Sequence, residues 1–223
     1  MGIDKNELNT SIFDFSKNRI NVISSKDDSL FEKILNPIMK QFIDKNAYNN
    51  IVINCEDVSV DEKVKSSVNY VENDYDTIFE NIYNYLESSN TKYEENNRNK
   101  QIFANVQKVN CVIIGVNSFK NKLSADNQSK FEKLFEDKYD LELVGYIFVD
   151  TIDKINKFAY DSWFKDSFNS GYGIYIGNGL EDQMLINVGK RIPEMKLDVP
   201  DNFGFVIKKG SASYVKFIEQ YKE

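Results

Sequence analysis

The sequence has no histidine among its 223 residues, and it contains only two cysteines and three prolines. Without histidine the chain lacks serine–histidine and cysteine–histidine nucleophile pairs, histidine general bases and the usual zinc ligands. Cys55 and Cys111 both lie in apolar runs, which favours two buried free thiols in a reducing compartment over a disulfide. Carboxylates, lysines and phosphate-binding loops remain as the candidates for chemistry.

Basic charge and long hydrophobic runs are also scarce. The 28 Lys and Arg residues are outnumbered by 35 Asp and Glu residues, which gives a net charge of −7. The average surface therefore repels a phosphate backbone, and we expect no nucleic-acid partner. No stretch approaches the roughly 20 apolar residues of a membrane span, and residues 1–9 lack the layout of a signal peptide. We expect a cytosolic segment without direct membrane insertion.

From residue 19 onward, short apolar runs alternate with segments of helical spacing. Strand-type runs are found at residues 19–24, 50–54, 109–116 and 143–149, and again at 172–176, 184–187, 204–208 and 213–217. Helical spacing is found at residues 29–42, 75–86, 128–138 and 151–160. This alternation predicts an α/β fold with a doubly wound, mostly parallel sheet and a β-rich C-terminal end. We expect one domain over residues 17–223, preceded by a polar lead of residues 1–16.

Local signals refine this prediction. Ser29 and Glu32 have the spacing of a capping box that opens a helix, and Pro37 inside the same pattern predicts a kink. Residues 88–100 are polar without an apolar period, which predicts a frayed helix end or a surface loop.

The first strand leads to the place where a mononucleotide-binding sheet carries a glycine-rich phosphate loop. The residues there are Ser24, Ser25, Lys26, Asp27, Asp28 and Ser29. Without glycine the turn cannot easily close its amides around a phosphate. A carboxylate about 4 Å from a phosphate opposes it by roughly 4 kcal/mol at an effective dielectric of 20. Asp28 or Ser29 can also cap the helix amides. We expect a degenerate loop that does not bind Mg-ATP.

A phosphate-transfer site also needs an acidic residue at the end of a central strand. The run at residues 112–117 ends in Gly115, Val116 and Asn117, none of which can act as a base, so this metal-carboxylate position is degenerate. Asp150 does close an apolar run, but its spacing to Asp153 also fits a helix N-terminus, and we favour the cap. We therefore predict no catalytic residue, no metal and no cofactor.

Two further features favour structural roles. The glycines of residues 171–179 do not follow the G-x-G-x-x-G pattern, so turns that flank a strand are the better interpretation. Trp163, Phe164 and Phe168 could form an exposed peptide-docking surface, but aromatic residues at helical spacing are usually core.

Two segments near the end of the chain carry a family resemblance. Residues 173–183 (GIYIGNGLEDQ) and 199–210 (VPDNFGFVIKKG) resemble the C-terminal end of the last ATPase-like domain of the EssC proteins. These proteins are the FtsK/SpoIIIE-type motors of type VII secretion systems. Together with the strand–loop–helix unit at residue 19 and the strand at residue 109, the likeness extends over nearly the whole chain from about residue 17. It implies a RecA/FtsK-like P-loop NTPase sheet with a degenerate nucleotide site.

The resemblance also implies a setting and partners. In this family several ATPase modules follow a membrane anchor, and the terminal modules commonly have degraded nucleotide sites. The implied role is a pseudo-ATPase module on the cytoplasmic side of a bacterial membrane, a soluble domain of a membrane-anchored protein. Its implied partners are secreted Esx-type helical-hairpin proteins and adjacent ATPase modules. Two alternatives are an active ATPase in which Lys26 and Asp150 serve an atypical ATP and magnesium site, and a purely structural assembly domain.

Overall fold

A computed structural model describes residues 2–4, 10–11, 13–43 and 48–217, and these residues form one mixed sheet of ten strands. Its strands are β1 (Gly2–Asp4), β2 (Thr10–Ser11), β3 (Ile20–Ser25), β4 (Tyr48–Asn54), β5 (Asn69–Val71), β6 (Lys108–Ile114), β7 (Val144–Thr151), β8 (Gly173–Ile176), β9 (Phe203–Lys208) and β10 (Ser211–Phe217). Their order is β2-β1-β10-β9-β8-β3-β7-β6-β4-β5. The neighbours from β8 to β5 are parallel, whereas β8 to β2 pair antiparallel. The prediction of a mostly parallel sheet with a β-rich end is confirmed.

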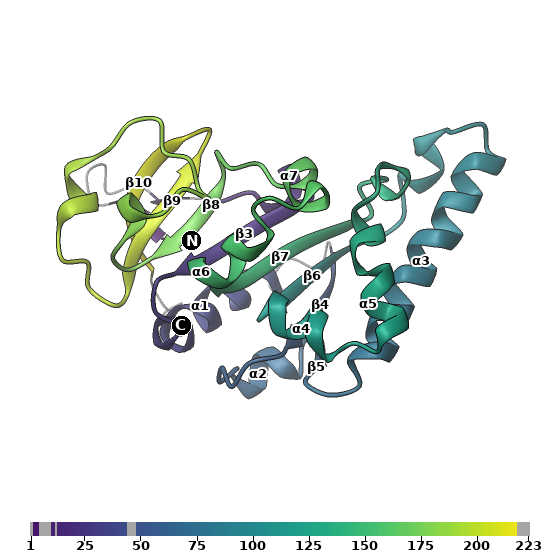
Figure 1. Cartoon of the computed structure of the whole chain (residues 1–223), viewed down its shortest axis with the longest axis horizontal. Coiled ribbons are helices and arrows are strands. Elements are labelled where there is room, and N and C mark those ends of the chain that lie inside the picture. The colour runs from purple at the N-terminus through teal and green to yellow at the C-terminus, as the bar shows by residue number, and fades with distance from the viewer. Residues whose placement is uncertain (1, 5–9, 12, 44–47, 218–223) are drawn as a thin grey trace.

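Helices cover both faces of the parallel part of the sheet (Figure 1). They are α1 (Ser29–Ile43), α2 (Glu62–Lys65), α3 (Tyr75–Glu95), α4 (Val116–Lys122), α5 (Ala125–Phe131), α6 (Ile152–Ile155) and α7 (Ser162–Ser167). The short 3-10 helices are η1 (Phe15–Lys17), η2 (Lys100–Phe103), η3 (Glu132–Phe135), η4 (Asp137–Tyr139), η5 (Asn156–Phe158), η6 (Leu180–Asp182) and η7 (Pro193–Lys196). Side chains of α1 and α2 pack in one apolar layer, and those of α3 to α7 pack in the other. None of the described helices combines the length and apolar character that a bilayer span requires.

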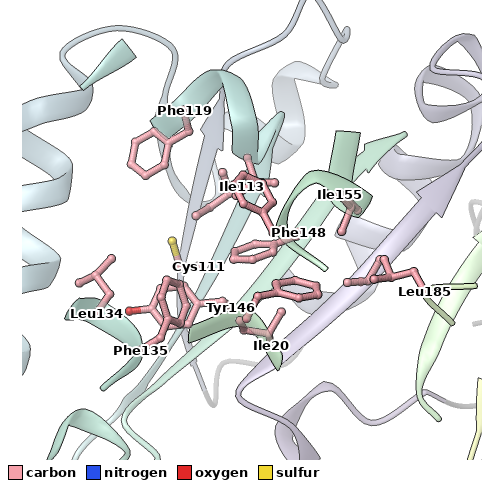
Figure 2. Packing of buried hydrophobic residues seen from close by; sticks show 14 of the residues in the cluster. Ile20, Cys111, Ile113, Phe119, Leu134, Phe135, Tyr146, Phe148, Ile155 and Leu185 are labelled. Atoms are coloured by element: carbon pink, nitrogen blue, oxygen red, sulfur yellow. The ribbon is translucent and has the colours of Figure 1, made fainter. Parts of the chain in front are cut away.

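The central strands bury side chains on both faces, as their nearly continuous apolar runs predict. In β7, Tyr146 and Phe148 point into the layer of α3 to α7, while Ile147 and Val149 point toward α1. Figure 2 shows Tyr146 and Phe148 among aromatic and aliphatic side chains from the covering helices. Trp163 lies in the same layer and is buried, so the core interpretation of this residue is confirmed.

The helix expected over residues 151–160 is shorter than predicted, since α6 ends at Ile155 and η5 follows. In three further segments that differ from the prediction, a tertiary contact outweighs the local pattern. The helix expected to fray after residue 88 continues to Glu95, since Ser89 is buried and Tyr93 packs against the core. The helix expected over residues 128–138 ends at Phe131 and is followed by two 3-10 helices. There the Arg19 guanidinium donates hydrogen bonds of 2.7–3.1 Å to the carbonyl oxygens of Leu134, Phe135 and Glu136.

The third difference is at residues 184–187, which form a loop where a strand was expected. The Gln183 side chain holds this loop: its amide nitrogen donates to the carbonyl oxygen of Ile186 at 2.9 Å, and its amide oxygen accepts from the Ile186 amide at 2.8 Å. The lead of residues 1–16 contributes β1, β2 and the start of η1, and α1 continues through Pro37.

Replacement of Phe148 by Ala tests the double-sided burial of the sheet. Phe148 is fully buried against the rings of Phe135, Trp163 and Phe164. We expect a loss of about 3–5 kcal/mol in the free energy of unfolding, measured by urea titration. Tyr160→Ala is the control, since an exposed side chain costs less than about 0.5 kcal/mol. Equal effects of both substitutions would contradict this packing.

Candidate functional site

Strand β3 lies between β7 and β8 and is parallel to both, so the carboxyl ends of the three strands lie side by side at one end of the sheet. The chain leaves β3 into α1 on one face of the sheet and leaves β7 into α6 on the other face. In open α/β sheets, ligands bind in the crevice where the connections diverge in this way. The candidate site is therefore the region where the ends of β3 and β7 meet the starts of α1 and α6.

The predicted phosphate loop is a short connection, since β3 ends at Ser25 and α1 begins at Ser29. Ser24 and Ser25 belong to β3 and are fully buried, whereas Lys26, Asp27 and Asp28 form the exposed turn before α1. The Ser24 hydroxyl donates to the carbonyl oxygen of Asp150 at 2.9 Å, which ties β3 to β7.

The start of α1 carries its own anion. Asp27 Oδ1 accepts the amide of Ser29 at 2.9 Å, so this carboxylate occupies one of the donors that a phosphate would use. Ser29 is already the first helical residue, so the predicted capping box of Ser29 and Glu32 is wrong, and Asp27 is the side chain that accepts the Ser29 amide.

The loop after β8 lies against this turn. Gly177 has φ of +74°, and a Cβ there would come within 2.6 Å of Leu30 Cδ1 in the first turn of α1. A Cβ on Gly179, whose φ is +95°, would lie 3.4 Å from Lys26 Cδ. These two glycines therefore allow the loop to approach α1 closely. The glycines of residues 171–179 serve turns around a strand, as expected, and not a dinucleotide loop.

The predicted metal-carboxylate position follows β6, the neighbour of β7 on the side away from β3. Gly115 precedes α4 with φ of +79°, and Val116 and Asn117 form the first turn of α4. A Cβ on Gly115 would come within 2.4 Å of Glu56 Cγ, so glycine is required for Glu56 to lie there. The Gly115 amide donates to the Val149 carbonyl oxygen at 2.8 Å, which places β7 between this position and the turn at Lys26.

Asp150 belongs to β7, so the interpretation of this residue as a helix cap is wrong. Its Oδ1 accepts the amide of the next residue, Thr151, at 2.8 Å, and α6 begins at Ile152. The side chain is 2% exposed, and among the described residues its Oδ2 has no hydrogen-bond partner. Burial raises the pKa of Asp150 from 3.8 to about 6, although the nearby Lys154 acts in the opposite direction.

A lysine between two carboxylates compensates this charge. Lys154 Nζ of α6 lies 2.9 Å from Glu56 Oε1 and 3.5 Å from Asp150 Oδ1. Glu56 Oε1 also accepts from the Ser118 hydroxyl of α4 at 2.7 Å. Burial opposes the ionisation of Glu56, but the hydrogen bonds from Ser118 and Lys154 outweigh it and lower its pKa. We call these three charged residues the carboxylate bridge.

Sequence reasoning did not single out Glu56 or Lys154. Two signals were available: Glu56 follows a strand run, and Lys154 lies four residues after Asp150, a spacing at which opposite charges face each other on a helix. In the described part of the chain, no group of three or more carboxylate or cysteine side chains is arranged to hold a metal.

The cysteines add no reactive group to the site. Both are free and buried, as expected. Burial raises the pKa of Cys55 and of Cys111 to about 12, so both thiols stay protonated and poorly nucleophilic near neutral pH.

An apolar groove of about 740 Å³ adjoins the turn at Lys26, between α6, α7 and the loop at residues 179–185. Its apolar lining includes Ile152, Phe164, Phe168 and Leu185. At its edge, Tyr160 is 90% exposed and Met184 is 95% exposed, the highest values among the large apolar side chains of the described residues. Large apolar side chains that gather in water beside a groove are typical of a protein-binding surface.

Comparison with solved structures identifies the fold, while no family model and no curated protein matches the sequence. The cytoplasmic domain of EssC superposes with a TM-score of 0.71 and 10% identity over 98% of this chain and 43% of its own. Thermomonospora curvata EccC (ATPases 2 and 3), in complex with a signal sequence peptide, superposes with a TM-score of 0.66 and 12% identity over 99% of this chain and 40% of its own. The pCW3 conjugation coupling protein TcpA, in its monomer form with ATPγS, superposes with a TM-score of 0.64 and 11% identity over 98% of this chain and 65% of its own.

The chain therefore has a P-loop NTPase-like fold. Within that class it has the fold of the EssC and EccC cytoplasmic ATPase domains of type VII secretion, as the resemblance of its C-terminal segments predicted. The chain spans less than half the length of these EssC and EccC structures, so it corresponds to one portion of them.

The pH dependence of stability tests the burial of Asp150. Its folded pKa of about 6 lies above its usual value of 3.8, so the folded chain binds this proton more tightly. The contribution of Asp150 to stability therefore falls as the pH rises from about 4 through 6, by at most about 3 kcal/mol. We expect wild type to lose this amount relative to Asp150→Asn in urea titrations between about pH 4 and 7. A difference that stays constant over that range would refute the raised pKa.

Proposed function

We propose that this chain is a non-catalytic, ATPase-like module of a type VII secretion motor, and that it binds segments of secreted proteins. In this proposal the module is a soluble domain on the cytoplasmic side of a membrane-anchored motor and also contacts adjacent ATPase modules. Its fold supports membership in such a motor. Esx-type helical-hairpin proteins are the secreted partners that we propose.

The observation that carries the absence of catalysis is the turn before α1. It has no glycine, its Asp27 carboxylate already accepts the Ser29 amide, and Gly177 of the loop after β8 approaches Leu30. A phosphate would have to displace that carboxylate and that loop. Moreover, the ammonium of Lys154 already contacts the carboxylates of both Glu56 and Asp150 beside the neighbouring strand ends.

The groove beside α6 is the docking surface that we propose for the secreted segment. It is apolar within, and it carries Asp153, Lys165 and Asp182 among its lining residues. An amphipathic helix or short peptide could insert a large apolar side chain between Tyr160 and Met184 and pair its charges at the edge. The EccC structure with the same fold was solved with a signal sequence peptide, which supports a peptide as the kind of ligand.

Calorimetric titration with Mg-ATP tests the nucleotide part of the proposal. We expect no saturable heat up to millimolar ATP, because the Asp27 carboxylate opposes a phosphate by roughly 4 kcal/mol at an effective dielectric of 20. Magnesium-dependent binding at micromolar ATP would overturn the proposal. If hydrolysis also disappeared in Asp150→Ala and Lys26→Ala, the active ATPase with an atypical site would be the better interpretation.

Alanine substitutions at the edge of the groove test the docking surface. A secreted Esx-type protein of the same organism, or its C-terminal peptide, is titrated against wild type, Tyr160→Ala and Met184→Ala. We expect each substitution to weaken binding roughly tenfold, as for a central apolar contact of an interface. Ile102→Ala is the matched control, because this side chain is also exposed, at 37%, but is not part of the groove. Equal affinities of all four proteins would exclude this surface.

A further inference from the structure

Helix α6 has two different contact partners. Lys154 reaches the carboxylates of Glu56 and Asp150, while Ile152, Asp153 and the following Asn156 line the apolar groove. The same short segment thus forms a wall of the groove and one end of the carboxylate bridge. Any movement of α6 away from the strand ends changes both.

The bridge joins segments that follow three parallel strands. Glu56 comes after β4, Ser118 lies in α4 after β6, and Asp150 with Lys154 closes β7 and continues into α6. Lys154 thereby links the end of β7 to the segment after β4. Glu56 in turn accepts the Ser118 hydroxyl of the segment after β6, the strand that lies between β7 and β4. The helix itself contributes little to its own position, since a four-residue α-helix is far too short to be stable alone.

Among the described residues, Lys154 is the only cation that forms an ion pair with Asp150. The only amide that Asp150 is seen to accept is that of its neighbour Thr151, and its Oδ2 is an unpartnered, buried oxygen. Lys154 is 32% exposed but Asp150 only 2%, so loss of the ammonium leaves a buried carboxylate without the cation beside it, which is costly. At neutral pH the loss of the Lys154 charge therefore favours movement of β7's end or of α6 to admit water to Asp150.

We propose that Lys154 is a positioning residue for the groove: its contacts with Glu56 and Asp150 hold α6 in the place where Ile152, Asp153 and Tyr160 form the docking surface. The proposal rests on the proposed function for the identity of the ligand, but not for the effect on α6. In this proposal, contacts at the carboxyl ends of the strands, the region that binds nucleotide in an active P-loop enzyme, fix one wall of the protein-binding groove.

Hydrogen exchange tests the effect on α6 without any ligand. Lys154→Met keeps a similar length of side chain and removes the charge, whereas Lys154→Arg keeps the charge. Lys157→Met is the matched control, since Lys157 is an exposed lysine in the following η5. At about pH 7.5 we expect amides of residues 152–160 to exchange roughly tenfold faster in Lys154→Met alone, with β3 and β6 unchanged. Normal exchange at residues 152–160 in Lys154→Met would overturn the proposal, as would a uniform increase over the whole chain.

Binding of the secreted protein gives a second, separable result. We expect Lys154→Met to weaken binding roughly tenfold, Lys154→Arg to restore it, and Lys157→Met to bind as wild type. If Tyr160→Ala weakens binding while Lys154→Met does not, the groove is right and the positioning role is wrong. If Tyr160→Ala has no effect but exchange at residues 152–160 still rises in Lys154→Met, the docking site is wrong and the effect on α6 stands.

Discussion

Burial of the central strands on both faces is the constraint on which the other features of this chain depend. Side chains in the middle of β3, β6 and β7 are enclosed between the layer of α1 and α2 and the layer of α3 to α7. Charged groups cannot be placed there without a large desolvation cost. Charged groups therefore lie at the ends of the strands: the turn at Lys26 follows β3, and the carboxylate bridge joins Asp150 of β7 and Lys154 of α6 to Glu56 after β4.

At those strand ends an anionic and a cationic side chain lie beside groups of opposite charge. Asp27 is the anion at the start of α1, and Lys154 is the cation between Glu56 and Asp150. Both placements are electrostatically favourable, because an anion stabilises a helix N-terminus and a cation stabilises a buried carboxylate. Side chains of the chain itself thus compensate the helix N-terminus and the buried carboxylate at the carboxyl ends of β3 and β7.

The sequence alone was enough for the main features of the fold, because they follow from local pattern. Continuous β-branched runs identified β6 and β7 as central strands, and alternation with helical spacing indicated a parallel sheet. The degenerate phosphate loop, which the absence of glycine between Ser24 and Ser29 indicates, stays a prediction. These properties depend on the composition of short segments, so they can be read without knowing what packs against them.

Contacts between distant segments decided the rest. Arg19 donates hydrogen bonds to carbonyl oxygens more than one hundred residues away, just after the point where α5 ends. Gln183 bonds with Ile186 and holds a loop where an apolar run predicted a strand. The pairing of Lys154 with Glu56 joins residues that lie 98 positions apart. No local pattern encodes such a pair, because its energy depends on burial and on a distance that exists only once the sheet has formed.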